Sequence, residues 1–285
     1  MMCQWDSLLG VLPLWLRNDV NELGKIRLQE LRLRINAPPE LNFGTDRIAL
    51  NRVITREDLL FCVNTASRYS PWAAETIAKG YLTISGGHRL GICGEGIYRN
   101  GGITGIRDIR SINLRVARDF PGIAASIRPE GSVLILGPPG SGKTTLLRDL
   151  ARQTAGKETV SVVDERGELF PEGIQPGNRM DILSGCPKAL GIDMVLRTIN
   201  PDWIVLDEIT NPEDVHTLLL AQGCGVRLMA TAHGSSLEDL RRRPVYRPLW
   251  EQNIFQTILI MNRNKSFVVE RNTPCYTNGS ALCLL

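Results

Sequence analysis

The second half of the chain alternates between short apolar runs and longer segments with helical spacing. Each apolar run has the length of a strand and stops at a polar residue or a glycine, which is typical of a buried strand. The predicted strands cover residues 134–136, 159–163, 203–207 and 226–231, and the predicted helices cover 146–151, 188–199 and 213–221. This order of elements predicts an α/β fold, a parallel sheet with helices on both faces.

A further helix and a hairpin are expected after the last of these strands. Ser236 is a capping residue for a helix that runs to Arg241-Arg242-Arg243. The three arginines either complement the C-terminus of that helix or contact another subunit or nucleic acid. Residues 257–261 and 266–270 then predict a hairpin at the edge of the sheet.

The first half of the chain contains both strand-like and helix-like patterns. Residues 30–36 alternate strictly between polar and apolar side chains, which predicts a half-buried strand. Segments 56–68 and 71–79 have helical spacing, whereas 81–98 predicts short strands broken by glycines and 103–116 predicts further strands. The glycines of 81–98 also suggest a nucleotide loop, but no helix follows them, so hairpin turns are the better interpretation.

A domain boundary is expected near residue 121. Phe120-Pro121-Gly122 predicts a hinge, and residues 123–127 predict a short helix beyond it. We therefore expect an N-terminal α+β domain with its linker at 1–120 and an α/β domain at 121–285. A chain of 285 residues is long enough to give both domains a core.

The first strand of the α/β domain leads into a phosphate-binding loop of the pattern G-x-x-x-x-G-K-T. Its glycines permit backbone turns that a Cβ would block, so successive N–H groups can point at one phosphate. The helix that follows adds its positive end. Lys143 supplies a charge for the β- and γ-phosphates, and Thr144 supplies a hydroxyl for Mg²⁺. The expected binding residues are Gly137, Pro138, Pro139, Gly140, Ser141, Gly142, Lys143, Thr144 and Thr145.

A second motif extends the prediction from binding to hydrolysis. The apolar run 203–206 ends in Asp207-Glu208, as expected for a central parallel strand whose carboxyl end faces a ligand. We expect Asp207 to hold Mg²⁺ opposite Thr144. Glu208 is the candidate for orienting or deprotonating the attacking water.

Two other strand ends are candidates for sensing the γ-phosphate. One strand ends at Asp164-Glu165-Arg166, where Glu165 either acts in the site or forms an ion pair with Arg166 or a neighbouring subunit. The other ends at Thr231-Ala232-His233. His233 is interpreted as a site residue, the alternative being a capping or packing histidine.

Composition and charge narrow the class of protein only slightly. Hydrophobic residues make up 43% and charged residues 22%, which is ordinary for a globular protein, and a net charge of +3 does not predict nucleic-acid binding. The seven cysteines include no C-x-x-C pair, so we expect reduced thiols in a reducing compartment. There is no secretory leader and no apolar stretch long enough to cross a membrane, so a cytoplasmic protein is expected.

Several longer strings resemble the stage III sporulation protein AA family of endospore-forming bacteria. They are ELRLRI at 30–35, KGYLTISGGHRLGICG at 79–94, SINLRVAR at 111–118, VDERGEL at 163–169 and RTINPD at 197–202. The resemblance extends over residues 20–272. That family is in turn similar to the hexameric ATPases of type II and type IV secretion and pilus assembly.

The resemblance implies a RecA-like P-loop ATPase core with a mainly parallel sheet, preceded by a smaller α+β domain. It implies ATP and Mg²⁺ as ligands and a homo-oligomer, expected to be a hexamer, with ATP at the subunit interfaces. The expected partners are membrane proteins of the stage III sporulation complex. The protein would then lie in the mother-cell cytoplasm and reach the membrane through those partners.

The resemblance also implies roles for individual residues. Asp164 and Glu165 match an acidic box, Asp207 and Glu208 a magnesium-binding strand, Thr231-Ala232-His233 a histidine box, and Arg107, Arg110 and Arg115 the arginines that reach the nucleotide from the N-terminal domain. The spacing does not decide among the three arginines. The chain departs from the secretion ATPases in having Asp207-Glu208-Ile209-Thr210 where they usually have Gly-Glu-Ile-Arg-Asp. It also lacks the zinc-binding cysteine module of some type II relatives, so no metal beyond Mg²⁺ is implied.

The leading hypothesis is a Mg²⁺-dependent motor ATPase that powers or assembles a membrane-spanning complex in endospore formation, with Glu208, Lys143, Glu165 and His233 as catalytic candidates. One alternative is a RecA-like motor on nucleic acid, against which stands the lack of basic stretches interleaved with aromatic residues. The other is an ATP-binding scaffold with little hydrolysis. Intact Lys143, Asp207 and Glu208 argue against the scaffold.

Overall fold

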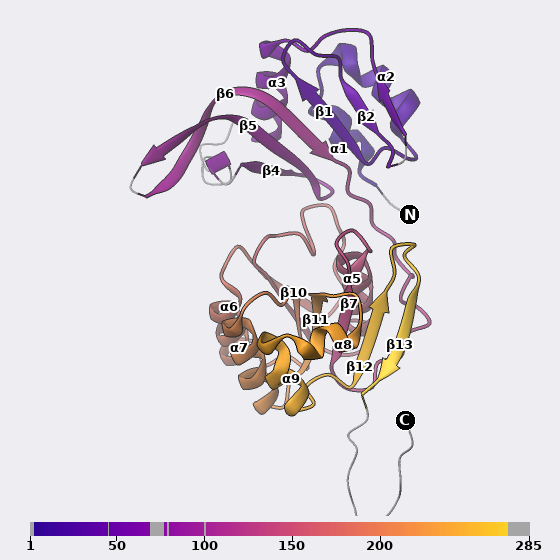
Figure 1. Cartoon of the computed structure of the whole chain (residues 1–285), viewed down its shortest axis with the longest axis vertical. Helices are drawn as coiled ribbons and strands as arrows, with labels where there is room; N and C mark the ends of the chain where they lie inside the picture. The colour runs from indigo at the N-terminus through magenta and orange to yellow at the C-terminus, as the bar shows by residue number, and fades with distance from the viewer. Residues whose placement is uncertain (1–2, 45, 69–76, 79, 100, 273–285) are drawn as a thin grey trace, which may run out of the picture. The chain divides into compact units, whose positions relative to one another are not determined.

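The computed structural model describes residues 3–44, 46–68, 77–78, 80–99 and 101–272 (Figure 1). The chain divides into two compact units. The first comprises Met1–Phe120 together with Pro171–Gln175, and the second comprises Pro121–Phe170 together with Pro176–Leu285. A short segment from the middle of the second unit thus belongs to the first, which nothing in the sequence pattern indicates.

The first unit is built on an antiparallel sheet of six strands in the order β3-β2-β1-β6-β5-β4. The strands are β1 Glu30–Arg34, β2 Glu40–Asn42, β3 Arg47–Ala49, β4 Tyr81–Ile84, β5 His88–Arg99 and β6 Gly102–Arg115. Three helices, α1 Trp5–Gly10, α2 Leu14–Gly24 and α3 Arg56–Ala66, supply apolar residues to the same core. Leu31 and Leu33 are fully buried in it, as the alternation along 30–36 predicts.

Some predictions for this unit are confirmed and others are wrong. The helix predicted from residue 56 is confirmed as α3, at whose start the side chains of Thr55 and Asp58 each accept a hydrogen bond from the backbone N–H of the other. The predicted breaks between residues 88 and 98 are wrong, since β5 is one strand that pairs with β6 as a long two-stranded arm (Figure 1). Gly91 and Gly96 pair regularly with Asn113 and Ile106, and Gly94 lies at a shift in register, so none of the three ends the strand. The helix predicted at 71–79 falls mostly outside the described residues.

The second unit is built on a seven-stranded sheet in the order β13-β12-β7-β11-β10-β8-β9. The strands are β7 Val133–Gly137, β8 Val160–Asp164, β9 Met180–Ser184, β10 Trp203–Glu208, β11 Arg227–His233, β12 Thr257–Met261 and β13 Phe267–Arg271. All neighbours are parallel except β12 and β13, which form the predicted edge hairpin. The carboxyl ends of β7, β8, β10 and β11 therefore lie along one edge of the sheet.

Helices cover both faces of this sheet, as predicted. The helices are α5 Lys143–Thr154, α6 Lys188–Thr198, α7 Pro212–Gly223, α8 Leu237–Arg242 and α9 Arg247–Glu251, with a 3₁₀ turn η2 at Pro244–Tyr246. Leu134, Leu136 and Leu206 share a core with α6 and α7. Alternate strand residues face opposite sides, so the intervening residues face α5. The helix predicted at 123–127 is wrong, since residues 121–126 form consecutive turns.

The segment Pro171–Gln175 is attached to the first unit by backbone and side-chain hydrogen bonds. The Gly86 N–H donates to the Glu172 carbonyl, and Gln4 Nε2 donates to the Gly173 carbonyl at 2.8 Å. Glu172 also forms an ion pair with Arg68 at 2.6 Å. We refer to Pro171–Gln175 as the returning segment.

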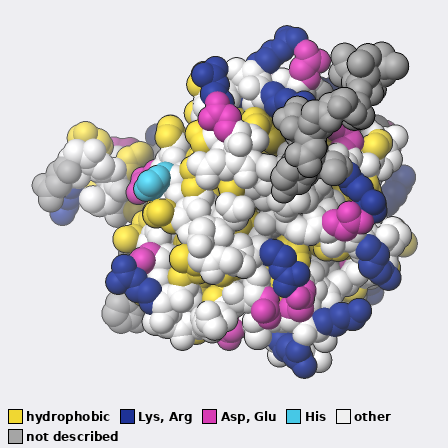
Figure 2. All heavy atoms as spheres, turned by 90° about the horizontal axis from the view of Figure 1, so that it is seen from below, with side chains coloured by type: hydrophobic (Ala, Val, Ile, Leu, Met, Phe, Trp, Pro, Cys, Tyr) yellow, Lys and Arg dark blue, Asp and Glu magenta, His cyan; other side chains and the backbone are white. Residues whose placement is uncertain are grey.

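On the face drawn in Figure 2, acidic and basic side chains are interspersed among apolar ones, and no single large basic area stands out. Among the described residues, no helix is both long and apolar enough to cross a membrane.

Candidate nucleotide-binding site

The loop between β7 and α5 has the backbone that a phosphate-binding loop needs. Gly140 and Gly142 adopt positive φ angles of 74° and 98°, which side chains other than glycine rarely allow. Gly137 has no room for a Cβ, which would lie 2.7 Å from Ser141 Oγ and 2.9 Å from the Met261 carbonyl oxygen. The N-terminus of α5 receives no hydrogen bond from a capping side chain. Its first N–H groups are therefore left for a ligand.

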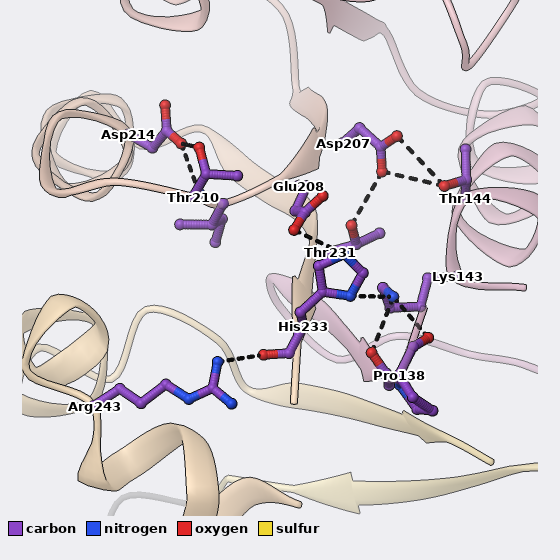
Figure 3. Close-up of polar contacts among 12 residues, drawn as sticks. Pro138, Lys143, Thr144, Asp207, Glu208, Thr210, Asp214, Thr231, His233 and Arg243 are labelled. Carbon is purple, nitrogen blue, oxygen red and sulfur yellow. Dashed lines mark hydrogen bonds and ion pairs between the residues drawn. The ribbon is translucent and has the colours of Figure 1, made fainter. Parts of the chain in front are cut away.

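Lys143 is buried and turned back onto its own loop. Its Nζ donates to the carbonyl oxygens of Gly137 at 2.9 Å and Pro138 at 3.1 Å, and it lies 2.9 Å from His233 Nδ1 (Figure 3). Burial lowers the pKa of Lys143, while Glu208 and Asp207 oppose that shift. The ammonium thus lies within the loop where phosphates are expected.

Asp207 lies between the hydroxyl groups of two neighbouring elements. Thr144 Oγ1 on α5 lies 3.4 Å from both of its carboxylate oxygens, and Thr231 Oγ1 on β11 donates to Oδ1 at 3.0 Å (Figure 3). Burial raises the pKa of Asp207, and the nearby carboxylates of Glu168, Asp164 and Glu208 raise it further. A cation placed here would offset that unfavourable charge.

Glu208 and Lys143 are joined through the imidazole of His233. Glu208 Oε1 lies 2.9 Å from His233 Nε2, while His233 Nδ1 faces Lys143 (Figure 3). Lys143 can only donate, so Nδ1 accepts and Nε2 carries the proton that is donated to Glu208. The His233 carbonyl in turn accepts from Arg243 Nη1 at 2.9 Å. The site interpretation of His233 therefore has a geometric basis that a capping role does not.

Asp164 and Glu165, the two carboxylates of the acidic box, lie in different environments. Asp164 is buried, and its oxygens accept from the backbone N–H groups of Glu168 at 3.0 Å and Leu169 at 2.7 Å, so it shapes the loop after β8. Glu165 is half-exposed and lies 3.6 Å from Lys188 Nζ. The sequence left open an ion pair of Glu165 with Arg166 or with a neighbouring subunit, and within this chain the structure places Lys188 beside Glu165 instead of Arg166.

The three candidate arginines lie on β6 in the first unit. Arg107 forms an ion pair with Glu95, and Arg115 forms one with Glu30. Arg110 is exposed, and its guanidinium has no hydrogen bond or ion pair with any residue that the structure describes, although its charge contributes to lowering the pKa of Glu95. Arg110 thus has the guanidinium that is free to bind something else.

Lys188 is the residue of this site that the sequence interpretation missed. It is buried and lines a small cleft together with Asp164, Glu165, Arg166, Asp207 and Glu208. One signal pointed to it, because a lysine at the first position of a helix faces the positive end of the helix dipole. Such a residue needs carboxylates nearby, which the sequence alone does not locate.

The residues present fit a nucleotide and a magnesium ion. Ser141 Oγ is buried in the loop and has no hydrogen-bond partner among the described residues. Thr144 and Asp207 offer a hydroxyl and a carboxylate side by side, and Mg²⁺ prefers oxygen ligands of this kind. A cation bound here would also offset the cost of the buried Asp207 carboxylate, whose pKa is raised mainly by burial.

Helix α5 also anchors the two stretches of chain that lead out of the second unit. The Asp149 carboxylate accepts from the N–H groups of Gly122 at 3.0 Å and Ala124 at 2.9 Å, just after the linker. The adjacent Arg148 donates to the carbonyl oxygens of Leu169 and Glu168, just before the returning segment. One helix therefore carries Lys143 at its start and both anchors further along.

Comparison with known sequences identifies a family that spans most of the chain. Residues 8–270 match the family described as "Sporulation stage III, protein AA". The chain is 41% identical over 281 residues to stage III sporulation protein AA of Bacillus subtilis (strain 168), covering 91% of this chain and 92% of that protein.

Comparison with solved structures supports the fold. The pilus retraction motor PilT with bound ADP matches with a TM-score of 0.67 at 16% identity, covering 98% of this chain and 85% of PilT. The Legionella pneumophila ATPase DotB matches with a TM-score of 0.59 at 18% identity, covering 91% of this chain and 80% of DotB. The predicted RecA-like core with a preceding α+β domain is confirmed.

Proposed function

The chain belongs to the sporulation stage III protein AA family, and on that premise we propose that it is a Mg²⁺-dependent ATPase. We further propose that it works as a homo-oligomeric ring, expected to be a hexamer, that powers or assembles a membrane-spanning complex during endospore formation. It would act in the mother-cell cytoplasm and dock on stage III sporulation proteins in the membrane.

One observation carries the proposal of hydrolysis. Lys143, Glu208 and His233 reach one edge of the sheet from three elements and are linked there by short polar contacts. Asp207 lies at the same edge, where Thr231 and Thr144 contact its carboxylate. Phosphoryl transfer needs mainly positioning and charge stabilisation, and this arrangement brings a cation, a metal ligand and a carboxylate base to the same place.

Each residue has a defined task in the proposed reaction. Lys143 exchanges its loop carbonyls for the phosphate oxygens. Thr144 and Asp207 would hold the magnesium ion, which neutralises charge on the phosphates when bound. Glu208 orients the attacking water and accepts its proton, while His233 holds the Glu208 carboxylate in place.

An arginine from a neighbouring subunit is expected to complete the site. We assign this role to Arg110, because Arg107 and Arg115 already pair with Glu95 and Glu30. A guanidinium at the transferring phosphate stabilises the charge that develops there.

The experiment that tests the proposal is Mg-ATP hydrolysis per subunit over a wide range of protein concentration, with Glu208→Gln as the control. We expect activity to rise steeply with concentration and then to saturate, because each site needs a neighbour. Constant activity at all concentrations would mean a self-sufficient monomer and would reject the ring.

The same assay separates the two alternatives. Absence of turnover by the wild type, with ATP still bound, would favour the scaffold. Adding single-stranded DNA is expected to leave the rate unchanged, and a stimulation that disappears at high salt would favour a nucleic-acid motor.

A further inference from the structure

Lys188 joins two carboxylates from different elements. It is the first residue of α6, and its side chain is 9% exposed. Its Nζ lies 3.2 Å from Asp214 Oδ2 at the start of α7 and 3.6 Å from Glu165 Oε2 just after β8. A buried cation persists only when it is paired, so these two contacts fix where the ammonium lies.

The close approach of α6 to β8 is built into the sequence. At Gly191, one turn after Lys188, a Cβ would lie 2.6 Å from Val163 Cγ1 and 2.9 Å from Cys186 Sγ. Any larger residue there would push α6 away from the strand. Glycine at this position therefore lets the Lys188 ammonium reach Glu165.

The contact with Asp214 extends to the turn that follows Glu208. Asp214 Oδ2 also accepts from the N–H of Thr210 at 2.8 Å and from its hydroxyl at 3.0 Å (Figure 3). Thr210 stands two residues after Glu208. One ammonium group thus touches Glu165 directly and supports the turn that carries Glu208.

The cleft that Lys188 lines is strongly acidic. Four of its six lining residues are the carboxylates Asp164, Glu165, Asp207 and Glu208. Such a cleft repels a polyphosphate unless cations offset its charge. Lys188 supplies one of the two positive charges in the lining, and unlike Arg166 it is buried.

We propose that Lys188 is a positioning residue of the ATPase site. It holds Glu165 at the cleft and supports the turn after Glu208. Its positive charge also offsets part of the negative charge of the four carboxylates, so that the cleft can accept phosphate. This inference rests on the proposed nucleotide-dependent function and adds a residue to it.

The first test measures nucleotide affinity with a fluorescent, non-hydrolysable ATP analogue, once with Mg²⁺ and once with EDTA. In Lys188→Met the affinity in EDTA is expected to fall by about tenfold, because one positive charge near the phosphates is lost. With Mg²⁺ the affinity is expected to fall by less than about threefold, because the ion replaces much of that charge. Lys188→Arg keeps the charge and is expected to restore the wild-type ratio of the two affinities.

Lys157→Met is the matched control, because Lys157 is an exposed lysine just beyond α5. Its two affinities are expected to equal those of the wild type. A lower melting temperature in Lys188→Met with an unchanged affinity ratio would mean a purely structural ion pair and would overturn the proposal.

The second test measures turnover. In Lys188→Met, kcat is expected to fall by about tenfold or more with little change in KM, since positioning affects mainly the reacting state. Adding Lys188→Met to the Glu165→Gln variant should then lower kcat by a much smaller factor than Lys188→Met does in the wild type, because the two residues act together. Full additivity would argue against a shared role and would overturn the proposal.

The two tests separate this inference from the proposed function. If the wild type binds the analogue but does not hydrolyse ATP, the ATPase proposal fails and the affinity ratio still decides the role of Lys188. If the wild type binds no nucleotide, both proposals are rejected.

Discussion

The imidazole of His233 lies between Lys143 and Glu208 and contacts both at 2.9 Å. Lys143 belongs to the phosphate-binding loop, whereas Glu208 belongs to the strand end that we expect to activate water. A change in the position of Lys143 therefore alters the hydrogen bonding of His233 and, through it, of Glu208. In the proposed mechanism, His233 would therefore link phosphate binding at Lys143 to water activation at Glu208.

Glu208→Gln tests the role of this carboxylate. The amide keeps the shape but cannot accept a proton, so turnover is expected to fall by at least about 100-fold while ATP binding is retained. The measurements are single-turnover hydrolysis and nucleotide affinity. The control is Glu213→Gln on the exposed surface of α7, which should behave as the wild type. Normal hydrolysis by Glu208→Gln would remove Glu208 from the mechanism.

His88 is buried in the first unit, and each nitrogen of its neutral imidazole takes part in a hydrogen bond. The Ala117 N–H donates to Nδ1, so Nε2 carries the proton and donates to the Gln4 carbonyl, both at 3.0 Å. Burial lowers the pKa of His88, and Arg118 lowers it further. The ring thus connects the first residues of the chain to the linker.

The lowered pKa of His88 predicts a pH-dependent free energy of unfolding. Above the ordinary histidine pKa of 6.5 the ring is neutral in both states, and its stabilisation is fully present. As the pH falls below that value, the unfolded chain takes up a proton that the folded chain does not, so stability is lost. Urea unfolding between pH 8 and pH 5 should show this loss reduced in His88→Gln. His216→Gln, on the exposed face of α7, should leave it unchanged.

At the residue scale, the sequence predicts contacts that lie within one motif better than contacts between motifs. The glycine-rich turn between β7 and α5 could be predicted because it follows local backbone rules and adjoins its own strand and helix. The pairing of Glu165 with Lys188 could not, because it depends on how closely α6 packs on β8 at Gly191. Arg166, the sequence neighbour of Glu165, was the wrong partner for that reason.

At the scale of elements, the prediction succeeded where the apolar pattern was strong. The fully buried strands β7, β8 and the apolar part of β10 were predicted, whereas β9 was missed. β9 lies at the sheet edge, and none of its residues is fully buried, so it carries no continuous apolar run. β13, at the other edge, is exposed as well but was predicted, because Phe267-Val268-Val269 is a continuous apolar run. The side-chain composition of an edge strand therefore decides whether the strand can be predicted.

The glycines of strand β5 show a second limit of strand prediction, because they suggested breaks where the strand continues. The register of β5 against β6 shifts between Cys93 and Glu95, at Gly94. A Cβ on Gly94 would lie 2.6 Å from the Arg107 carbonyl oxygen and 2.8 Å from that of Asp108. The glycine thus permits close approach within a bulge instead of ending the strand.

Gly94→Ala tests this interpretation of the arm. The clash with backbone atoms is expected to lower the free energy of unfolding by about 1–3 kcal/mol, measured by urea denaturation. Gly96→Ala is the matched control in the same strand, since the nearest atom to its Cβ would be Ile103 Cδ1 at 3.9 Å. Equal stability of the two variants would contradict the close-approach explanation.

At the scale of the whole molecule, the proposed ring predicts complementation between defective subunits. Lys143→Ala lacks the loop lysine, and Arg110→Ala lacks the proposed arginine, so each protein alone should be inactive. In an equal mixture, roughly a quarter of the interfaces combine an intact loop with an intact arginine, and activity should partly return. Mixed rings with no recovered activity would place the arginine elsewhere.

The returning segment limits how the two units could be exchanged between related genes by recombination. Residues 171–175 complete the first unit, although the chain on either side of them belongs to the second. A single recombination event near residue 120 would bring in a foreign N-terminal domain but keep the old segment, separating Gly86 and Gln4 from partners adapted to them. The two units are therefore not exchangeable modules. Substitutions in residues 171–175 are expected to be tolerated only together with matching changes in residues 1–120.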